Sequence, residues 1–162
     1  MAQLTFEDSA AISALIHRYC SILDRMELDC LGEVFTEDCR VTYGEKEPYI
    51  VRGRSRLRSS LRRMWRFRAT SHHTSNIHVR AIDQSAAEVE SYFIAWQSPT
   101  EGEDTVIYGR YVDQFVRTAA GWRIRERVMS IQGASSNYRN PLHRSPRNPP
   151  EPGWEASLEG WR

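Results

Sequence analysis

Residues 105–131 read TVIYGRYVDQFVRTAAGWRIRERVMSI, and this stretch decides the fold. Apolar and polar side chains alternate along much of it, which is the period of a half-buried β-strand. The turn formers Ala119-Ala-Gly121 interrupt the alternation, so the stretch predicts two long antiparallel strands, Thr105–Thr118 and Trp122–Ile131. A third strand at Glu88–Gln97 precedes them after a polar loop and extends the pair into a meander.

Helical periodicity dominates the N-terminal part of the chain. Thr5 followed by Asp8 is typical of a helix start. Apolar residues then recur at intervals of three and four, the period of a helix with one buried face. This stripe consists of Ala11, Ile12, Leu15, Ile16, Tyr19, Ile22, Leu23 and Met26. Asp24 lies off the stripe on an ideal helical wheel, which directs it toward solvent or into a distorted last turn.

Shorter elements lie between this helix and the long strands. The pattern predicts a turn at Thr36–Asp38, short strands at Cys39–Tyr43 and Tyr49–Val51, and an arginine-rich helix that begins at Arg54 and reaches about Arg66. Helices followed by long antiparallel strands predict an α+β domain with helices on one face of a curved sheet. Such a sheet encloses a mostly apolar cavity of the kind that binds small molecules.

Composition narrows the function classes. The chain has 22 basic and 21 acidic residues, so no overall field favours nucleic acid or an anionic membrane as partner. The arginines between Arg52 and Arg68 are read as a solvated basic helix, because no nucleic-acid-binding motif accompanies them. Three cysteines, no signal peptide and no apolar run long enough for a membrane span predict a reduced, cytoplasmic protein. Metal-ligand clusters, phosphate loops and nucleophile motifs are absent from the sequence, so we expect no metal and no cofactor.

The stretch Thr70-Ser-His-His-Thr-Ser-Asn-Ile-His-Val-Arg80 is the candidate centre of the chemistry. Strand alternation places His72, Thr74, Asn76 and His78 on one face and the residues between them on the other. A polar strand face meets water or lines a cavity, and a histidine in a cavity is well suited to move a proton near neutral pH. The alternative is that these histidines are ordinary surface or core residues.

The C-terminal part of the chain is rich in turn formers. Its prolines predict an extended tail over residues 133–162, after a domain formed by residues 1–132. Apolar side chains in the tail predict that it packs along its own domain or along a neighbouring subunit; they are Tyr138, Leu142, Trp154, Leu158 and Trp161.

Five short motifs follow one another along the chain: Tyr19 with Asp24, Tyr43, the segment Ser71–Asn76, the segment Gly109–Phe115 and the segment Gly121–Arg127. In this order they resemble the nuclear-transport-factor-2-like superfamily. Within it they resemble the SnoaL-like, polyketide-cyclase-like branch that includes scytalone dehydratase, bile-acid dehydratase and hexachlorocyclohexane dehydrochlorinase. The resemblance covers about residues 5–132 and implies a cone formed by a curved antiparallel sheet, capped by N-terminal helices. It also implies a homodimer or homotrimer.

The resemblance implies that His72 abstracts a proton and that Asp24 orients it. Asp24 would then face the interior, contrary to its position on the helical wheel. A carboxylate bonded to one imidazole nitrogen would fix the tautomer and stabilise the imidazolium. His73 is the rival base, since a β-bulge here could exchange the two faces.

The resemblance also assigns roles to polar groups around the base. Tyr19 and Tyr43 match positions that point at the substrate or its leaving oxygen, although both could be buried structural tyrosines. Arg127 matches a position that holds a carbonyl, a carboxylate or a leaving anion. Alternatively, Arg127 belongs with Arg123 and Arg125 to a row of alternate arginines that faces solvent. We further expect three residues to line the substrate pocket: Trp96, Tyr111 and Asn76.

One departure affects the expected reaction. The acidic partner sometimes present on the strand after the histidine has no clear counterpart, and Glu90 is the nearest substitute. The expected function is a cofactor-independent lyase of the dehydratase type, acting on a small hydrophobic, ring-bearing or polyketide-like substrate. An isomerase or aldol-type cyclase in the same pocket is one alternative, and a non-catalytic binding or assembly module is another.

Overall fold

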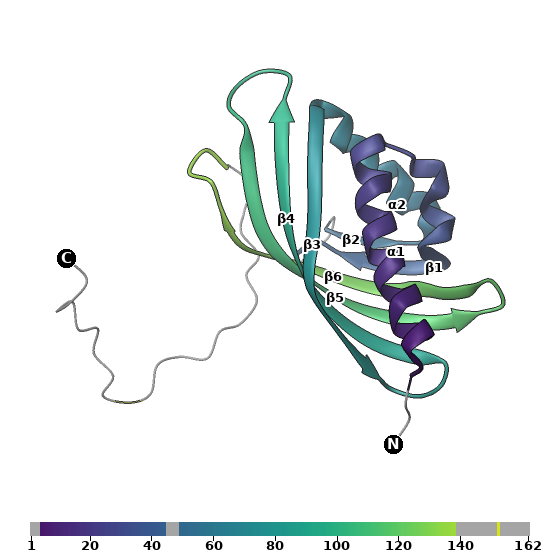
Figure 1. Ribbon diagram of the computed structural model, residues 1–162. Coiled ribbons are helices and arrows are strands. Elements are labelled where there is room, and N and C mark those ends of the chain that lie inside the picture. The colour runs from purple at the N-terminus through teal and green to yellow at the C-terminus, as the bar shows by residue number, and fades with distance from the viewer. Residues whose placement is uncertain (1–3, 45–48, 139–151, 153–162) are drawn as a thin grey trace.

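The computed structural model describes residues 4–44, 49–138 and 152 (Figure 1). Two α-helices, two 3-10 helices and six strands follow one another in those residues. In chain order they are α1 (Phe6–Arg25), η1 (Leu28–Glu33), β1 (Phe35–Thr42), β2 (Ile50–Arg52), α2 (Arg54–Leu61), η2 (Arg62–Arg66), β3 (Phe67–Ala81), β4 (Ala86–Pro99), β5 (Thr105–Thr118) and β6 (Gly121–Ala134).

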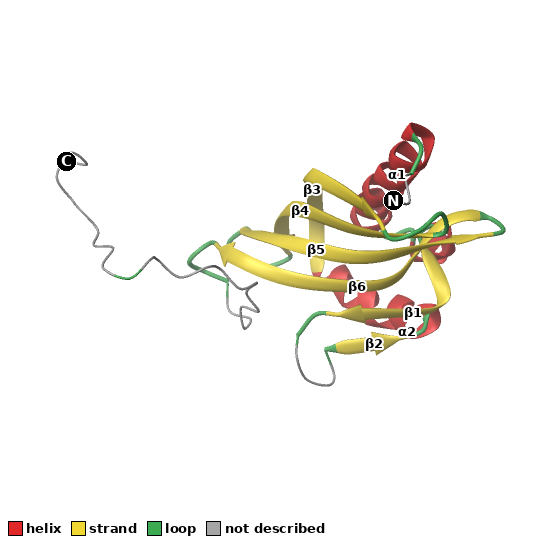
Figure 2. Ribbon diagram, turned by 90° about the horizontal axis from the view of Figure 1, so that it is seen from below, coloured by secondary structure: helices red, strands yellow, loops and turns green. Residues whose placement is uncertain are grey.

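The six strands form one curved sheet in the order β2-β1-β6-β5-β4-β3. Both α-helices lie on the same side of this sheet (Figures 1 and 2), and α1 packs along β3. The predicted α+β class, with helices on one face of a curved sheet, is therefore confirmed. The sheet is mixed rather than wholly antiparallel, because β1 runs parallel to β6. The long chain segment between these strands makes the parallel pairing possible.

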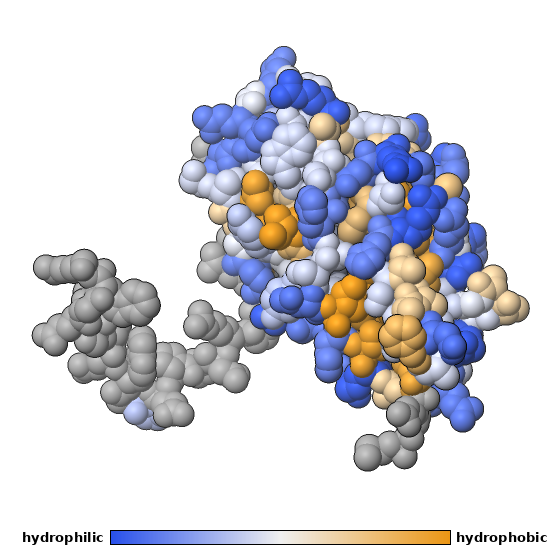
Figure 3. Space-filling model, in the orientation of Figure 1, coloured by the Kyte–Doolittle hydropathy of each residue, from blue (hydrophilic) through white to orange (hydrophobic). Residues whose placement is uncertain are grey.

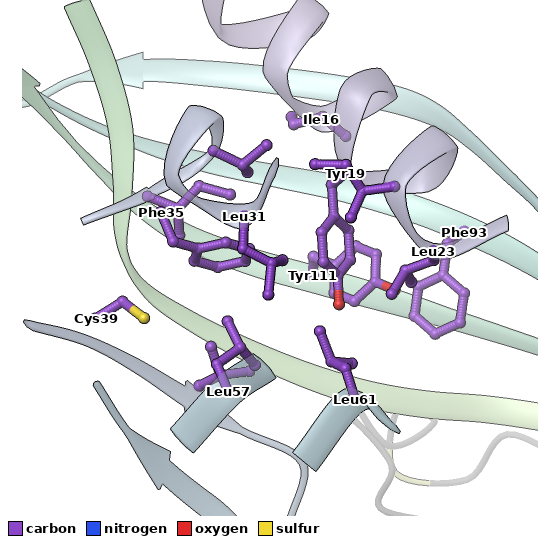
Figure 4. Packing of buried hydrophobic residues seen from close by; sticks show 14 of the residues in the cluster. Ile16, Tyr19, Leu23, Leu31, Phe35, Cys39, Leu57, Leu61, Phe93 and Tyr111 are labelled. Atoms are coloured by element: carbon purple, nitrogen blue, oxygen red, sulfur yellow. The ribbon is translucent and has the colours of Figure 1, made fainter. Parts of the chain in front are cut away.

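Helix α1 begins and ends with standard capping contacts. The Thr5 hydroxyl accepts from the backbone N–H of Asp8, and the Asp8 carboxylate accepts from the backbone N–H of Thr5, which confirms the predicted start. Met26 ends the helix in the left-handed conformation, with φ of 54°. The apolar stripe of α1 joins residues of the sheet and α2 in the hydrophobic core shown in Figure 4.

Two of the shorter elements differ from the sequence prediction. The turn expected at Thr36–Asp38 is wrong, because β1 already begins at Phe35. Phe35 pairs with Ile124 of β6 and Arg40 with Glu126, so residues 36–38 lie in an irregular part of the strand between two pairings that local propensity does not reveal. The arginine-rich helix ends at Leu61 and continues as the 3-10 helix η2. Beyond Leu61 the segment contains no buried residue, so no apolar face sustains a regular α-helix there.

A β-bulge in β3 divides the polar stretch. Ser75 pairs with Tyr92 and His78 with Glu90, which leaves one residue more on β3 than on β4 between these pairs. Asn76 absorbs it with a φ of 50°, a conformation that asparagine tolerates better than most residues. Beyond the bulge Ile77 turns toward the core, while Asn76 and His78 are exposed. The prediction that both share a face with His72 is therefore wrong.

A second bulge lies in β6. Phe115 pairs with Ile124 and Gln114 with Glu126, so Arg125 is the extra residue. Arg125 and Glu126 are both exposed, and Arg127 returns to the interior with 1% of its surface exposed. The alternative of a solvated stripe of three alternate arginines is therefore wrong for Arg127. Its side chain belongs to the core because the bulge changes the phase of the strand.

On the inner face of the sheet, side-chain and backbone atoms of the neighbouring strands lie very close to Gly109. A Cβ atom there would lie 2.3 Å from the Ser130 carbonyl oxygen and 2.4 Å from the Phe93 ring. Only glycine allows this packing. At the end of β6 the chain still follows the sheet, since the backbone N–H of Ser135 donates to Val106. Tyr138 packs against the core, and the other predicted tail anchors lie outside the described residues.

The helix side of the molecule is covered mainly by hydrophilic side chains, between which smaller hydrophobic areas appear (Figure 3). Among the described residues, no helix is both long and apolar enough to cross a membrane.

Candidate active site

Asp24 and His72 meet between the end of α1 and the middle of β3. His72 Nδ1 lies 2.6 Å from Asp24 Oδ1. The backbone N–H of His72 donates to Asp24 Oδ2 at 3.0 Å, and the Thr70 hydroxyl donates to Oδ1 at 2.8 Å. Three hydrogen bonds from one strand therefore hold the carboxylate in place, although 26% of its side chain is exposed.

The position of Asp24 follows from a second stripe on α1. His17, Cys20, Ser21 and Asp24 recur at helical spacing beside the core stripe, and they line a pocket together with residues of β3. The helical wheel placed Asp24 away from the core stripe, but the flank of the helix that bears it faces the edge strand. The pocket has a volume of about 360 Å³ and is also lined by His72, His73 and Thr74.

The environment of Asp24 favours its charged form. Burial raises the pKa of this carboxyl, but the hydrogen bonds from the His72 ring, the His72 backbone and Thr70 outweigh that effect and lower the pKa below its ordinary value. A charged carboxylate accepts a hydrogen bond, so it selects the tautomer in which His72 Nδ1 carries the proton. Nε2 then carries the lone pair. Among the described residues it has no hydrogen-bond partner, so it is the nitrogen available to a substrate.

His73 belongs to the opposite face of β3. It pairs with Ile94, whose side chain is exposed, whereas His72 pairs with the buried Ala95. The Ser71 hydroxyl lies 2.9 Å from His73 Nε2. The bulge in β3 comes after these residues, so it does not exchange the two histidines. The structure thus brings His72 to Asp24 and directs His73 outward.

Arg127 forms a second polar centre within the core. Its Nε and Nη2 each donate at 2.7 Å to the carboxylate of Asp113, and neither side chain is exposed. The guanidinium carbon lies 4.4 Å from the ring centre of Tyr19 and 4.0 Å from that of Tyr111. The third nitrogen, Nη1, is buried without a hydrogen-bond partner among the described residues. It is a charged donor directed at no acceptor of this part of the protein.

The tyrosines of this centre remain neutral phenols. Burial raises the pKa of Tyr19 and of Tyr43, and the two side chains are close enough to influence each other. The Tyr43 hydroxyl is buried without a hydrogen bond of standard geometry to any described residue. In Figure 4 Tyr19 reaches from α1 between Phe35 and Tyr111, and its hydroxyl points toward the α2 side of the core. Neutral phenols in this position can donate to an oxygen that gains negative charge.

Contacts along the inner face connect the two centres. Thr74, the next inward residue after His72, pairs with Phe93 on β4. The Phe93 ring stacks on Tyr111 with ring centres 4.4 Å apart, and Tyr111 in turn contacts Arg127. Cys20 lies within electrostatic reach of both centres: burial raises the pKa of its thiol, and the charges of Arg127 and Asp24 have smaller effects.

Asp113 is the residue of this site that sequence reasoning missed. The spacing of Tyr111, Asp113 and Phe115 placed it on the inward face of its strand, and an acid on an inward face requires a partner. The partner, Arg127, is separated from it by a hairpin and a bulge. Burial raises the pKa of Asp113, and the bidentate contact with Arg127 opposes that shift.

Two other sequence-derived positions lie on the outer face. Trp96 pairs with Ser71 and Val106, not with His72, and its indole N–H donates to Asp104 at 3.1 Å. Asn76 occupies the bulge and is exposed. Neither side chain shares a face with the dyad, so the expectation that they line the same pocket is wrong. Tyr111, by contrast, is buried beside Tyr19.

Glu90 cannot take the place of the acidic partner on the inner face. It lies on the outer face, where its carboxylate is 3.8 Å from an Arg110 nitrogen. The inward neighbours on β4 are Val89, Ser91 and Phe93, and none of them is an acid. The strand after the histidine therefore offers no carboxyl group to the interior.

Within residues 4–44 and 49–138, no group of three or more histidine, cysteine, aspartate or glutamate side chains is placed to hold a metal ion. The expectation of a cofactor-free site stays a prediction.

Comparisons with known proteins agree with this fold. The family model of the SnoaL-like domain matches residues 5–128. A structure from Novosphingobium aromaticivorans, provisionally assigned as a scytalone dehydratase, has a TM-score of 0.79 and 27% identity over 86% of this chain and 94% of that chain. A second structure from the same organism, provisionally assigned as an aromatic ring hydroxylase, has a TM-score of 0.75 and 24% identity over 82% and 95% of the two chains.

The hexachlorocyclohexane dehydrochlorinase LinA-type3 from Novosphingobium barchaimii is similar in fold. Its TM-score is 0.68 and its identity 17%, over 87% of this chain and 94% of that chain. A search of curated protein sequences finds no match.

Proposed function

Because the chain belongs to the SnoaL-like family, we propose that it is an enzyme of the dehydratase type that acts on a small hydrophobic molecule without a cofactor. The structural neighbours provisionally assigned as a scytalone dehydratase and identified as a dehydrochlorinase support this class of reaction. The observation that carries the proposal is the Asp24–His72 pair, in which a charged carboxylate fixes the imidazole tautomer.

The proposed reaction begins with proton removal by His72. Nε2 takes a proton from a carbon next to a carbonyl group, and the C–H electron pair moves into the carbonyl to form an enolate. Asp24 stabilises the resulting imidazolium through its 2.6 Å contact with Nδ1. Arg127 Nη1 is a buried donor without a partner among the described residues, and the Tyr43 hydroxyl makes no hydrogen bond of standard geometry to them, so both are suited to the enolate oxygen. The enolate electrons then re-form the carbonyl, the α,β double bond forms as the C–O bond to the β-hydroxyl breaks, and the His72 imidazolium returns its proton to the departing hydroxide, which leaves as water.

The substrate is expected to be apolar and ring-bearing. Tyr19, Phe93 and Tyr111 surround the polar groups with aromatic surface, and aromatic rings favour stacked or edge contacts with a ring. The few polar groups among these rings would fix its orientation.

One observation favours isomerisation as a second candidate. The inner face of β4 offers no carboxylic acid to protonate a leaving hydroxyl, and Glu90 faces outward. With the same base, an enolate can be reprotonated at another carbon, which needs no departing group. Product mass distinguishes the two reactions, since dehydration removes a water molecule and isomerisation leaves the mass unchanged.

The test compares His72→Ala with His73→Ala on a panel of cyclic β-hydroxy ketones. The reactions are followed by mass spectrometry, and in D₂O by NMR of deuterium entering next to the carbonyl. We expect His72→Ala to slow proton removal about 10²–10⁴-fold, because it removes the general base. His73→Ala also alters the border of the pocket but removes no histidine paired with Asp24, so it should slow proton removal far less than His72→Ala. A folded His72→Ala protein with full turnover would refute the mechanism.

If the wild-type protein gives neither product nor exchange but still binds these ketones, the non-catalytic binding module replaces the enzyme.

A further inference from the structure

A second pocket lies at the end of the sheet where β3 begins and β4 ends, at the top of Figure 1. It has a volume of about 430 Å³, which is within the usual range of small-molecule sites. The start of β5 also reaches this end of the sheet, since Gln97 pairs with Thr105. We call this cavity the mouth pocket. Its lining includes Arg66, Phe67, Gln97, Pro99, Asn137 and Tyr138.

The mouth pocket opens onto the same face of the sheet as the Asp24–His72 pair. Gln97 is directed inward, with 7% of its surface exposed, and it pairs with Thr70 on β3. Thr70 is the residue whose hydroxyl donates to Asp24. Side chains that lie directly opposite each other on two strands are neighbours on one face. The mouth pocket therefore adjoins the Asp24–His72 pair along the inner face.

Two arginines of η2 lie at this mouth. The Arg66 side chain lines the pocket, and its guanidinium carbon is 4.8 Å from the ring centre of Phe67. The Arg63 guanidinium carbon is 4.6 Å from the ring centre of Tyr43, whose hydroxyl is buried in the interior. Side chains three residues apart in a 3-10 helix are eclipsed, so Arg63 and Arg66 lie on one face of η2.

The described part of the chain does not neutralise these two charges. In the preceding helix α2, Arg58 pairs with Asp29 at 2.8 Å. By contrast, Arg63 and Arg66 form no ion pair with a described acid, including Glu103, which also lines the mouth pocket. A guanidinium binds a carboxylate or a phosphate through two parallel hydrogen bonds. Positive charge at the opening of a cleft also raises the local concentration of an anion.

The interior is a poor place for the charged end of a ligand. Arg127 is neutralised there by Asp113, and its free Nη1 is assigned to the enolate oxygen in the proposed reaction. Asp24 adds a negative charge beside the base. An anion moved into this region would lose its hydration and meet no further cation. At the exposed arginines of the mouth, an anion keeps part of its water and gains charged donors.

We propose that the substrate carries an anionic group, a carboxylate or a phosphate, which Arg63 and Arg66 hold at the mouth pocket while its rings extend inward to His72. The inference rests on the proposed function and narrows its substrate class to a ring-bearing acid. Phe67, where β3 begins, and His72 are five residues apart, which is about 17 Å of extended strand. The anionic group is therefore remote from the reacting carbon, at the other end of a substrate with more than one ring.

The test measures binding to the full-length protein by isothermal titration calorimetry, so it does not depend on turnover. The probes are 2-naphthylacetate with its neutral counterpart 2-naphthylacetamide, and 2-naphthyl phosphate with its neutral counterpart 2-naphthol. The wild type should bind at least one acid about tenfold more tightly than the neutral counterpart. The acid with the larger preference identifies the group as a carboxylate or a phosphate.

Substitutions in η2 locate the bound anion. Arg66→Gln and Arg63→Gln should each weaken binding of the preferred acid about tenfold and leave the neutral probe unchanged, because each removes a charged donor. Arg62→Gln is the matched control, since Arg62 belongs to the same 3-10 helix but stacks on Trp65, which is 56% exposed. In about 0.15 M salt, which screens distant charges, Arg62→Gln should change neither affinity more than about twofold.

His72→Ala separates this inference from the proposed function. The variant should keep the preference for the acid, because the base takes no part in binding at the mouth. Equal affinity of the wild type for acids and neutral probes, including no binding of any of them, would overturn the inference. So would equal losses in Arg62→Gln and Arg66→Gln. An acid preference together with full turnover by His72→Ala would instead refute the mechanism and leave the mouth pocket supported as an anion-binding site.

Discussion

The buried Asp113–Arg127 pair can be tested by replacing Asp113 with asparagine, a change that removes one charge and nearly preserves the shape. The carboxylate accepts two hydrogen bonds of 2.7 Å from Arg127, and neither side chain is exposed. In Asp113→Asn the side-chain NH₂ would face one guanidinium N–H, so one hydrogen bond becomes a contact between two donors. The Arg127 charge would then be buried without a carboxylate.

The expected loss is large because the pair is fully buried. Removing one partner of such a pair costs about 3–5 kcal/mol of unfolding free energy. The contacts of Arg127 with Tyr19 and Tyr111 are present in both proteins and do not reduce the difference. For a domain of this size, each kcal/mol lowers Tm by about 2–4 °C, so we expect a decrease of about 6–20 °C.

Urea unfolding followed by circular dichroism measures this loss. Glu88→Gln is the matched control, because Glu88 lies 2.6 Å from Arg80 in an ion pair whose side chains are 35% and 59% exposed. That change should cost less than about 1 kcal/mol. The double variant Asp113→Leu with Arg127→Met should recover much of the loss, since it leaves no charge buried. If Asp113→Asn costs no more than Glu88→Gln, the reasoning about this pair is refuted.

Two further predictions concern stability. Asp8, whose pKa is lowered to about 2 chiefly by hydrogen bonds from Trp122 and Arg117, and Asp24 both bind protons less readily in the folded protein than in the unfolded chain. The stabilisation that these two carboxylates contribute should be complete above about pH 4 and should be lost as the pH falls through their folded pKa values. Urea unfolding should therefore show that the difference in unfolding free energy between the wild type and Asp24→Asn narrows on acidification. A difference that stays constant with pH would contradict this. Gly109→Ala should lower the unfolding free energy by about 1–3 kcal/mol, because the new Cβ would lie 2.3 Å from the Ser130 carbonyl oxygen. Gly133→Ala, where a Cβ meets nothing within 4 Å, is the control, and equal effects of the two changes would contradict the packing argument.

Sequence periodicity predicted the long elements well, because each of them has a clear local signal. The alternation in β5, the turn before Gly121 and the capping pair Thr5 and Asp8 are all local, and the structure contains the predicted elements. The start of β1 was missed because its pairing partners lie far along the chain. Stabilisation from such partners does not appear in local propensity.

The candidate site was predictable only in part. The family resemblance, not periodicity, indicated that Asp24 faces His72; the structure shows the reason in the polar flank of α1 that follows β3. Asn76 was misplaced because a strand was assumed to alternate without interruption. Asp113 was missed because strict alternation does not direct Arg127 inward; the bulge at Arg125 does, and it is not visible in the sequence. Both errors concern pairing between strands, which a single strand cannot reveal.

The bulges at Asn76 and Arg125 also determine how this chain can be compared with relatives. Each bulge shifts the alternation of its strand by one residue. If odd-numbered side chains face the interior before the bulge, even-numbered ones face it after the bulge. A relative that lacks one residue there could retain every neighbouring side chain in the same order and still present its arginine to water. When two such sequences are aligned, the place of the gap along the strand therefore carries more information about the interior than the identities on either side of it.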